Sequence, residues 1–318
     1  MSITWGCSRL RDWIGGCLAA AAALLLLGGC ADRLYFYPDN KQYLAASRIV
    51  HQERWVQTAP GIFLHVWWLP ATGPAATAVH PLGTIVQLHG NAANLTAHVQ
   101  QVFWLTRDGY NVVVWDYRGY GTSTGRPDRQ AILNDTRILL QKIATWPEVQ
   151  AAGPVFLLGQ SLGGSLALIV AGTGTLPSVR GVIADSAFAS WRGVAEEKLQ
   201  ATGTLGWMLS GLVPLLVSGG PDPEDTVARI RVPVLLLQGD RDNVVPVDNL
   251  DRLYRRAHPP VWRWRVHGAG HVEALSRYRA QLEPGILAFL KFCADGQSDR
   301  QPLAPGLIEE KRNGRTEK

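Results

Sequence analysis

Ser161 lies between glycines in the string Gly159-Gln160-Ser161-Leu162-Gly163, which follows an apolar run, 155–158, and precedes a stretch with helical spacing. A serine at a sharp turn from strand to helix is presented at the helix N-terminus, and flanking glycines let the strand and the helix approach closely. A phosphate-binding glycine loop would need a lysine, and this string has none. The pattern therefore favours Ser161 as a nucleophile.

A serine hydroxyl is a weak nucleophile near neutral pH and needs a neighbouring base, in most enzymes a histidine. His271 follows Gly268-Ala269-Gly270 after the last apolar run, where a loop can carry it over a sheet edge. His89 is expected to brace the loop after a strand, His98 to lie on a helix and His267 to pack at a strand end. We therefore expect His271 to be the general base.

An acid must hold the imidazole in the right tautomer and stabilise its charge, so an aspartate should follow the strand that precedes the histidine's strand. The string Gln238-Gly239-Asp240-Arg241-Asp242 follows the apolar run 234–237. It offers Asp240 and Asp242, and the spacing alone leaves both open.

Catalysis by a serine nucleophile with a histidine and an aspartate also needs an oxyanion hole, in which each preorganised N–H donor lowers the barrier by roughly 3 to 4 kcal/mol. The residue after the nucleophile supplies one donor through its backbone, so we expect the Leu162 N–H to serve. The second donor should come from the loop after the run 84–88, where Gly90 allows a close backbone approach. We nominate the Asn91 N–H.

The remaining pattern indicates the elements that position these residues. The runs 84–88, 112–115, 155–158 and 234–237 are almost uninterrupted in apolar residues, as in strands buried on both faces, and 179–184 and 261–266 are weaker candidates. The segments 53–58 and 62–69 are joined by Pro60-Gly61, as in a hairpin. Segments with helical spacing, such as 130–146 and 161–171, lie between the strands. This alternation predicts an α/β fold, a mostly parallel sheet covered by helices on both faces.

Five motifs resemble, in order, the signatures of α/β-hydrolases of the serine aminopeptidase-like, abhydrolase-domain group. They are His89-Gly90-Asn91-Ala92, Asp116-Tyr117-Arg118-Gly119-Tyr120-Gly121, the Ser161 string, Gly239-Asp240-Arg241-Asp242-Asn243-Val244-Val245-Pro246, and Gly270-His271. The resemblance spans about 54–292 and implies the α/β-hydrolase fold. It implies Asp242, rather than Asp240, as the catalytic acid, and structural roles for Asp116 and Arg118. One departure is Gln238, where the group often has His, a change not expected to touch catalysis.

The N-terminal 29 residues have the pattern of an export signal: a basic start with Arg9 and Arg11, then an uncharged run, 14–27. This run is short for a membrane-spanning anchor, which is the alternative reading. The end, Leu27-Gly28-Gly29-Cys30, resembles the lipobox of bacterial lipoproteins, which implies that Cys30 becomes the lipidated N-terminus. We therefore expect a protein of the cell envelope, anchored by lipid in the outer membrane or on the periplasmic face of the inner membrane.

The remaining chain divides into an α/β-hydrolase domain, 30–293, and a polar tail, 294–318, which we expect to be disordered. Within the domain, 191–230 breaks the rhythm of strands and helices and is expected to form a small helical cap. Cys293 sits in an apolar stretch and is expected to be a buried residue rather than a reactive thiol.

The formal net charge of the chain is +5, and the densest basic stretch, 252–265, alternates with apolar residues as a solvated face would. No Cys/His cluster with metal-ligand spacing is present in the sequence, and no nucleic-acid partner, metal or cofactor is expected. The partners that we expect are a small-molecule or acyl substrate and a membrane.

The complete set of candidate groups and the apolar cap favour hydrolysis of carboxylic esters or thioesters through an acyl-enzyme. The first alternative is an aminopeptidase-like amidase, which would need carboxylates to hold a free amine, with Glu196, Glu197 and Glu224 as candidates. The second is an envelope lipoprotein that keeps the fold as a non-catalytic binding module. Substrate identity follows from the shape of the cap rather than from the fold.

Overall fold

The computed structural model of the chain describes residues 35–73, 80–174, 176–200, 202–204, 210–211, 213, 220–258, 260–295 and 308–313. The expected signal peptide, 1–29, and the expected lipid-bearing Cys30 lie outside these residues. None of the described helices has both the length and the apolarity that crossing a membrane requires.

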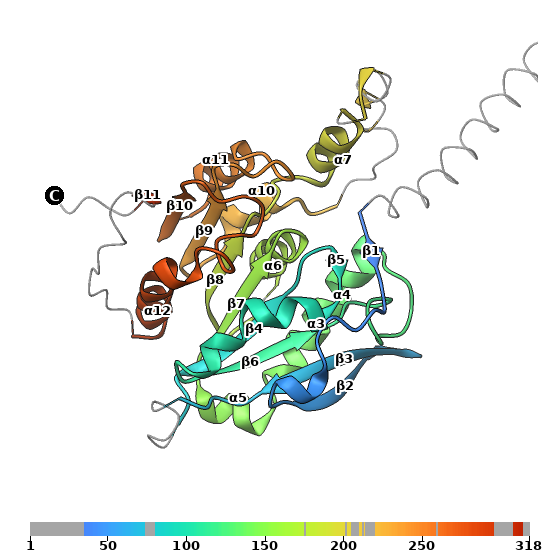
Figure 1. Cartoon of the computed structure of the whole chain (residues 1–318), viewed down its shortest axis with the longest axis vertical. Helices are drawn as coiled ribbons and strands as arrows, with labels where there is room; N and C mark the ends of the chain where they lie inside the picture. Colours follow the sequence, from blue (N-terminus) through green and yellow to red (C-terminus); the bar gives the residue numbers. More distant parts are fainter. Residues whose placement is uncertain are drawn as a thin grey trace, which may run out of the picture. The chain divides into compact units, whose positions relative to one another are not determined.

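The described strands of the main sheet run in the spatial order β11-β10-β9-β8-β7-β4-β6-β3-β2 (Figure 1). They are β2 (Gln52–Ala59), β3 (Ile62–Leu69), β4 (Gly83–Leu88), β6 (Tyr110–Trp115), β7 (Val155–Gln160), β8 (Val179–Asp185), β9 (Val234–Gly239), β10 (Val261–Val266) and β11 (Ile308–Asn313). The six from β4 to β10 are parallel, whereas β2, β3 and β11 join antiparallel. The expected hairpin and the expected mostly parallel sheet are therefore confirmed.

Helices cover both faces of this sheet (Figure 1), because the central strands β4, β6, β7 and β9 are buried along their whole length and alternate side chains point to opposite faces. Phe156 and Leu158 of β7 share a core cluster with Leu105 and Phe289, while Leu157 between them points the other way. The first face carries α3 (Leu95–His98), η3 (Val99–Gln101), η4 (Phe103–Thr106) and α12 (Arg279–Asp295); the second carries α4 (Arg129–Ile143), α5 (Pro147–Ala152), α6 (Leu162–Thr173) and α11 (Asp248–Arg256).

Short elements complete the described chain: β1 (Tyr37–Pro38), η2 (Ala46–Arg48), β5 (Ala92–Ala93), α7 (Trp191–Gln200), α10 (Pro223–Thr226) and η5 (Val227–Arg229). Local sequence explains several boundaries. Asp128 caps α4 by accepting the Ala131 N–H at 2.8 Å, and Pro147 begins α5, where its missing N–H is not needed.

The C-terminal tail differs from the expectation of disorder over 294–318. Residues 308–313 form β11, which pairs antiparallel with β10 from Val266↔Ile308 to Val261↔Asn313, and α12 continues to Asp295. The expectation was wrong for 308–313 because main-chain hydrogen bonds to a sheet edge do not require apolar side chains. The other tail residues, 296–307 and 314–318, lie outside the described part of the chain.

The chain divides into two compact units, and the described residues of the smaller one are Tyr35, Phe36 and those between Trp191 and Gly220. Within this unit the Tyr35 ring meets the Trp191 ring edge-on at 5.3 Å, and the Tyr35 hydroxyl donates to the Trp191 carbonyl at 2.9 Å. The expected insert, 191–230, is thus divided, because Pro221 and the residues after it belong to the larger unit, where α10 packs against α6.

Candidate functional site

Ser161 stands at the sharp turn between β7 and α6 with φ +53° and ψ −117°, outside the usual region for a residue with a side chain. Its N–H donates to the Asp185 carbonyl at 2.8 Å, which fixes the turn against β8. A Cβ on Gly159 would overlap the Gly163 carbonyl, and a Cβ on Gly163 would overlap the Leu88 carbonyl. The two glycines therefore permit the strained turn that presents Ser161.

The side chains of Ser161, His271 and Asp242 lie in one hydrogen-bonded row. His271 Nε2 is 2.9 Å from Ser161 Oγ, and His271 Nδ1 is 2.8 Å from Asp242 Oδ2. Because an ionised carboxylate can only accept, Nδ1 carries the ring proton and Nε2 is free to accept the Ser161 hydroxyl proton. The structure thus brings together the three side chains that the sequence nominated, at distances at which a proton can pass.

The Asp242 carboxylate is held ionised by its donors. Its Oδ1 accepts the N–H groups of Val244 and Val245, both at 2.9 Å. Burial alone would raise the pKa of the Asp242 carboxyl, but the hydrogen bond and the charge of His271 and these backbone donors outweigh it and lower the pKa below its ordinary value. The carboxylate therefore stays charged beside the imidazole at neutral pH.

Gln238 contacts the same carboxylate, which the sequence reasoning missed. Its side-chain amide donates to Asp242 Oδ2 at 3.2 Å and to the Val245 carbonyl at 2.5 Å. The expectation that a change at this strand end would not touch catalysis stays a prediction, although the side chain lies against the carboxylate of the nominated acid. Its position directly before Gly239, at the carboxyl end of β9, was the available signal.

A second missed contact holds the turn that follows His271. Val272 has φ +51°, which is strained for a β-branched residue, and its N–H donates to Ser186 Oγ at 3.2 Å. Ser186 in turn donates its hydroxyl to Asp185 Oδ1 at 3.0 Å. This chain of bonds ties the His271 loop to the carboxyl end of β8, which also holds Ser161.

Asp185 is fully buried beneath this row. Burial raises the pKa of its carboxyl to about 7, against the lowering effects of the Ser186 hydroxyl, the His271 charge and the Gln160 amide. The Gln160 amide lies 3.5 Å from Asp185 Oδ2, and Gln87 donates to Gln160 at 3.1 Å. A buried polar network thus joins β4, β7 and β8 below the nucleophile.

The two residues nominated for the oxyanion hole lie at the ends of neighbouring strands. Leu162 is the first residue of α6, so its N–H has no acceptor within the helix. Asn91 follows β4, and its side-chain oxygen accepts the Tyr37 N–H at 3.0 Å and the Tyr120 hydroxyl at 2.8 Å. These bonds fix the Asn91 loop at the end of β4. Strand β4 pairs with β7, the strand that leads to Ser161.

The other candidates of the sequence take supporting places. The buried His89 ring lies against Tyr117, with ring centroids 4.2 Å apart, and Tyr117 donates to the His89 carbonyl at 2.8 Å. Asp116 accepts the Leu95 N–H at 2.7 Å, and Arg118 holds Asp135 with two hydrogen bonds, at 2.5 and 2.7 Å. These contacts agree with the structural roles expected for them.

The structure contradicts the expectation for His267 and agrees with the expectation for Cys293. His267 is exposed and lies 3.0 Å from Asp240 Oδ2, so the expectation that it would pack was wrong. Cys293 is buried, and burial raises the pKa of its thiol well above the usual range, as expected for a packed residue rather than a nucleophile. Among the described residues, no group of three or more His, Cys, Asp or Glu side chains is placed to hold a metal ion.

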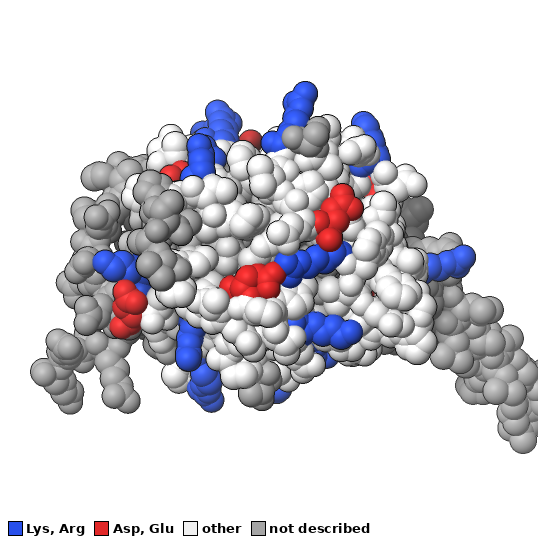
Figure 2. Space-filling model, turned by 90° about the horizontal axis from the view of Figure 1, so that it is seen from below, with Lys and Arg blue, Asp and Glu red and all other residues white. Residues whose placement is uncertain are grey.

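The basic stretch 252–265 is largely paired with acids. Arg252 lies 2.8 Å from Glu224, and Arg263 and Arg265 both pair with Asp251. Arg263 is buried, so this stretch is only partly the solvated face that we expected. On the face seen in Figure 2, the described basic and acidic side chains are interspersed rather than gathered by sign.

Comparison with known proteins finds relatives over most of the chain. A family model described as serine aminopeptidase, S33, matches residues 79–223. The uncharacterized protein YfhR of Escherichia coli K12 is 31% identical over 277 residues, which cover 85% of this chain and 92% of YfhR. The α/β hydrolase domain-containing protein WAV2 of Arabidopsis thaliana is 27% identical over 79% of this chain and 82% of its own.

Solved structures share the fold at lower identity. The Pyrococcus furiosus esterase Pf2001 superposes with a TM-score of 0.65 at 20% identity, covering 81% of this chain and 97% of the esterase. Proline iminopeptidase from Mycobacterium smegmatis gives a TM-score of 0.57 at 15% identity, covering 76% and 99%. At such identities the likeness concerns the fold and does not separate an esterase from a peptidase.

Proposed function

The chain belongs to the serine aminopeptidase S33 family of α/β hydrolases, and on this premise we propose that it hydrolyses carboxylic esters or thioesters with Ser161, His271 and Asp242. The observation that carries the proposal is the row of hydrogen bonds Ser161–His271–Asp242, with distances of 2.9 and 2.8 Å. A serine hydroxyl, an imidazole and an ionised carboxylate in this order are the parts that acyl transfer requires.

In the first half of the proposed reaction, Ser161 Oγ attacks the substrate carbonyl carbon while its proton passes to His271 Nε2. Asp242 accepts the hydrogen bond from Nδ1–H and stabilises the imidazolium that forms. The Leu162 and Asn91 N–H groups donate to the oxygen that becomes negative. When the tetrahedral intermediate collapses, the bond to the alcohol or thiol breaks and His271 returns the proton to that leaving group.

In the second half, water attacks the acyl-enzyme and gives its proton to His271 Nε2. The second tetrahedral intermediate releases the carboxylic acid, and the proton returns to Ser161 Oγ. The strained backbone of Ser161 supports this cycle, because its turn holds the hydroxyl at the N-terminus of α6, where developing negative charge is favoured.

Esters and thioesters are favoured over aminopeptidase substrates because one of the three candidate carboxylates for binding a substrate amine already pairs with arginines. Glu224 lies 2.8 Å from Arg252 and 3.8 Å from Arg256, so its negative charge is compensated within the fold. Glu196 and Glu197 lie on α7, in the smaller unit, and are the remaining candidates for that alternative.

Steady-state hydrolysis of nitrophenyl esters, acyl thioesters and amino-acid anilides tests the proposal. We expect turnover of the first two and at most weak turnover of anilides. Ser161→Ala should abolish turnover and fluorophosphonate labelling without changing the melting temperature. Ser165→Ala is the matched control, since Ser165 is a buried serine in the first turn of α6 whose hydroxyl donates to the Phe188 carbonyl. A wild-type protein that resists the probe would favour a non-catalytic binding module, and preferred anilides would favour the amidase.

We also propose that the mature protein is anchored through lipid on Cys30, which rests on the resemblance of Leu27-Gly28-Gly29-Cys30 to a lipobox. Cys30→Ser should move the protein out of the membrane fraction or leave an unprocessed precursor that retains its signal. Palmitate labelling with fractionation measures this. Wild-type processing and fractionation of the variant would contradict the anchor.

A further inference from the structure

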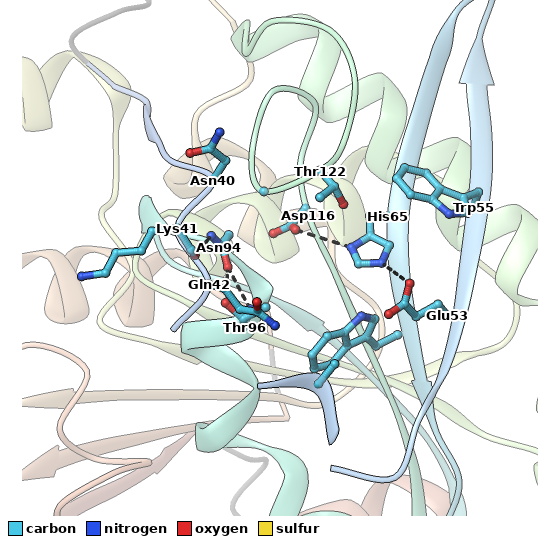
Figure 3. A pocket seen from close by; sticks show the side chains of 13 residues that line it. Asn40, Lys41, Gln42, Glu53, Trp55, His65, Asn94, Thr96, Asp116 and Thr122 are labelled. Atoms are coloured by element: carbon cyan, nitrogen blue, oxygen red, sulfur yellow. Dashed lines mark hydrogen bonds and ion pairs between the residues drawn. The ribbon is translucent and has the colours of Figure 1, made fainter. Parts of the chain in front are cut away.

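A cavity of about 300 Å³ lies apart from the Ser161 row in the larger unit (Figure 3). It is bounded by the segment before η2, by β2 and β3, by the residues around Asn94 and by the loop after β6. Neither Ser161, His271 nor Asp242 lines it. A volume of this size is at the lower end of small-molecule sites.

Three rings form one wall of this cavity. Trp55 is 52% exposed, and its ring lies 4.9 Å from that of His65, while the Trp67 ring meets His65 edge-on at 6.3 Å. His51 stacks on Trp67 at 3.9 Å and fixes it in place. An indole face attracts cations through its quadrupole, and an exposed tryptophan at the mouth of a cavity offers such a face.

Two carboxyl groups, of Glu53 and Asp116, line the same cavity. Glu53 lies 3.3 Å from His65 Nε2 and 3.6 Å from His51 Nε2, and Asp116 lies 4.0 Å from His65 Nδ1, as the dashed lines in Figure 3 mark for His65. Burial lowers the pKa of His65 despite the opposing effect of Glu53, so its imidazole is neutral at neutral pH. His65 therefore does not cancel the Glu53 charge.

The single Lys or Arg among the lining residues is Lys41. Its ammonium group lies over the Tyr43 ring, 5.2 Å from the centroid, and Figure 3 shows the side chain extending away from Glu53 and Asp116. The cavity thus combines aromatic faces with negative charge that its own lysine does not approach. The described residues hold no group of three or more side chains suited to a metal ion, which argues against a bare metal cation.

We propose that this cavity binds a small organic ammonium ion, with the Glu53 carboxylate facing its charge and Trp55 and Trp67 enclosing its apolar substituents. An ammonium ion with carbon substituents matches both features, because the charge meets the Glu53 carboxylate and the C–H groups meet the rings. A neutral ligand of the same shape would leave the Glu53 charge unused. The site is independent of the proposed hydrolysis, because binding here requires no turnover at Ser161.

Isothermal titration of the purified protein with tetramethylammonium, butylammonium and choline tests the proposal. At least one ion should saturate with a Kd of about 10 mM or below, and 3,3-dimethylbutan-1-ol, the neutral carbon isostere of choline, should bind at least about tenfold more weakly than choline. Equal binding of the isostere, or no saturation by any ion up to about 50 mM, would overturn the proposal. This comparison needs no variant.

Variants then locate the site. Glu53→Gln keeps the shape and removes the charge, and Trp55→Leu removes the ring; each should weaken the tightest ion by about tenfold. Glu148→Gln is the matched control, because Glu148 pairs with Arg54 and does not line the cavity. Circular dichroism verifies that each variant is folded. A folded Glu53→Gln protein that binds like the wild type, or a Glu148→Gln protein that loses binding equally, would place the ion elsewhere.

Discussion

Asp242 and Asp116 both follow strands of the same sheet and both lie near a histidine, yet their carboxyl groups differ in ionisation. Asp242 accepts two backbone N–H groups and the His271 ring, and its pKa is lowered. Asp116 accepts one backbone N–H, from Leu95, and burial raises its pKa to about 7. The donors to Asp242 thus outweigh its burial and keep it charged beside a histidine, whereas the single N–H donor to the more deeply buried Asp116 does not offset burial.

The two histidines differ in their second partner. His271 Nε2 faces the hydroxyl of Ser161, whereas His65 Nε2 faces the carboxylate of Glu53. A neutral imidazole between a carboxylate and a hydroxyl can move a proton from the hydroxyl, but one between two carboxyl groups has no nucleophile to activate. The same residue types thus fit the proposed acyl transfer in one region and the proposed cation binding in the other.

The largest test of this comparison replaces each aspartate with asparagine. Asp242→Asn should lower kcat by about 10⁴-fold while the fold is kept, because an amide stabilises the wrong imidazole tautomer. Asp116→Asn should lower kcat by less than about tenfold, since the Asp116 carboxyl accepts the Leu95 N–H and does not contact His271. Steady-state rates on one nitrophenyl ester measure both. The comparison fails if the two variants lose activity equally.

A smaller effect is expected from the contact that holds the His271 turn. Ser186→Ala removes the acceptor of the Val272 N–H, so the positive φ of Val272 is no longer supported. We expect kcat to fall by about 10- to 100-fold with little change in KM, because a displaced general base weakens the transition state more than substrate binding. Ser165→Ala, which removes a hydroxyl that bonds the Phe188 carbonyl rather than the Val272 N–H, should retain activity. An unchanged kcat in Ser186→Ala would show that the His271 loop keeps its conformation without the Ser186 hydroxyl.

The raised pKa of the Asp185 carboxyl and the lowered pKa of the Asp242 carboxyl predict opposite responses of stability to pH. Asp185 has a folded pKa of about 7 against an ordinary 3.8, so between these values the folded protein keeps a proton that the unfolded chain releases. The free energy of unfolding therefore falls as pH rises from about 4 to 7, by up to about 1.4 kcal/mol per unit for this group. For Asp242 the pKa is lowered, so its contribution is present above the ordinary pKa and is lost as pH falls through the folded value.

Asp185→Asn separates these contributions, because an amide does not titrate. The melting temperature of the variant, relative to that of the wild type, should rise between pH 5 and pH 8. Asp116 also has a raised pKa and remains in the variant, so part of the slope should persist. An unchanged slope in scanning calorimetry across this range would mean that Asp185 is ionised in the folded protein at every pH tested.

The sequence predicted those parts of the fold and the site that depend on local pattern. The strand 155–158 and the glycines around Ser161 are each indicated by a few neighbouring residues, whereas the choice of Asp242 over Asp240 rested on the resemblance to a family. The contacts of Ser186 with Val272 and of Gln238 with Asp242 were not predicted, because they join residues through strand neighbours and loop conformations that no spacing encodes. Strand β11 was not predicted for another reason, since pairing with a sheet edge requires only main-chain hydrogen bonds and leaves no apolar pattern in the sequence.

The smallest expected effect concerns Asp240, the alternative acid. Its Oδ1 accepts the Gly268 N–H at 2.8 Å and its Oδ2 lies 3.0 Å from Nδ1 of the exposed His267. Burial opposes ionisation, but the His267 hydrogen bond and the Gly268 N–H together outweigh it and lower the pKa of Asp240, so it is charged at neutral pH and links the ends of β9 and β10. Since exposed pairs contribute about 0 to 1 kcal/mol, Asp240→Asn should lower the melting temperature slightly. The effect should vanish at acidic pH, where the Asp240 carboxyl of the wild type is itself protonated and neutral.

Turnover of Asp240→Asn should stay within about twofold of the wild type, because the side chain does not touch His271. Measuring rate and melting temperature together is decisive: a collapse of kcat in Asp240→Asn beside a near-normal Asp242→Asn would exchange the roles of the two aspartates.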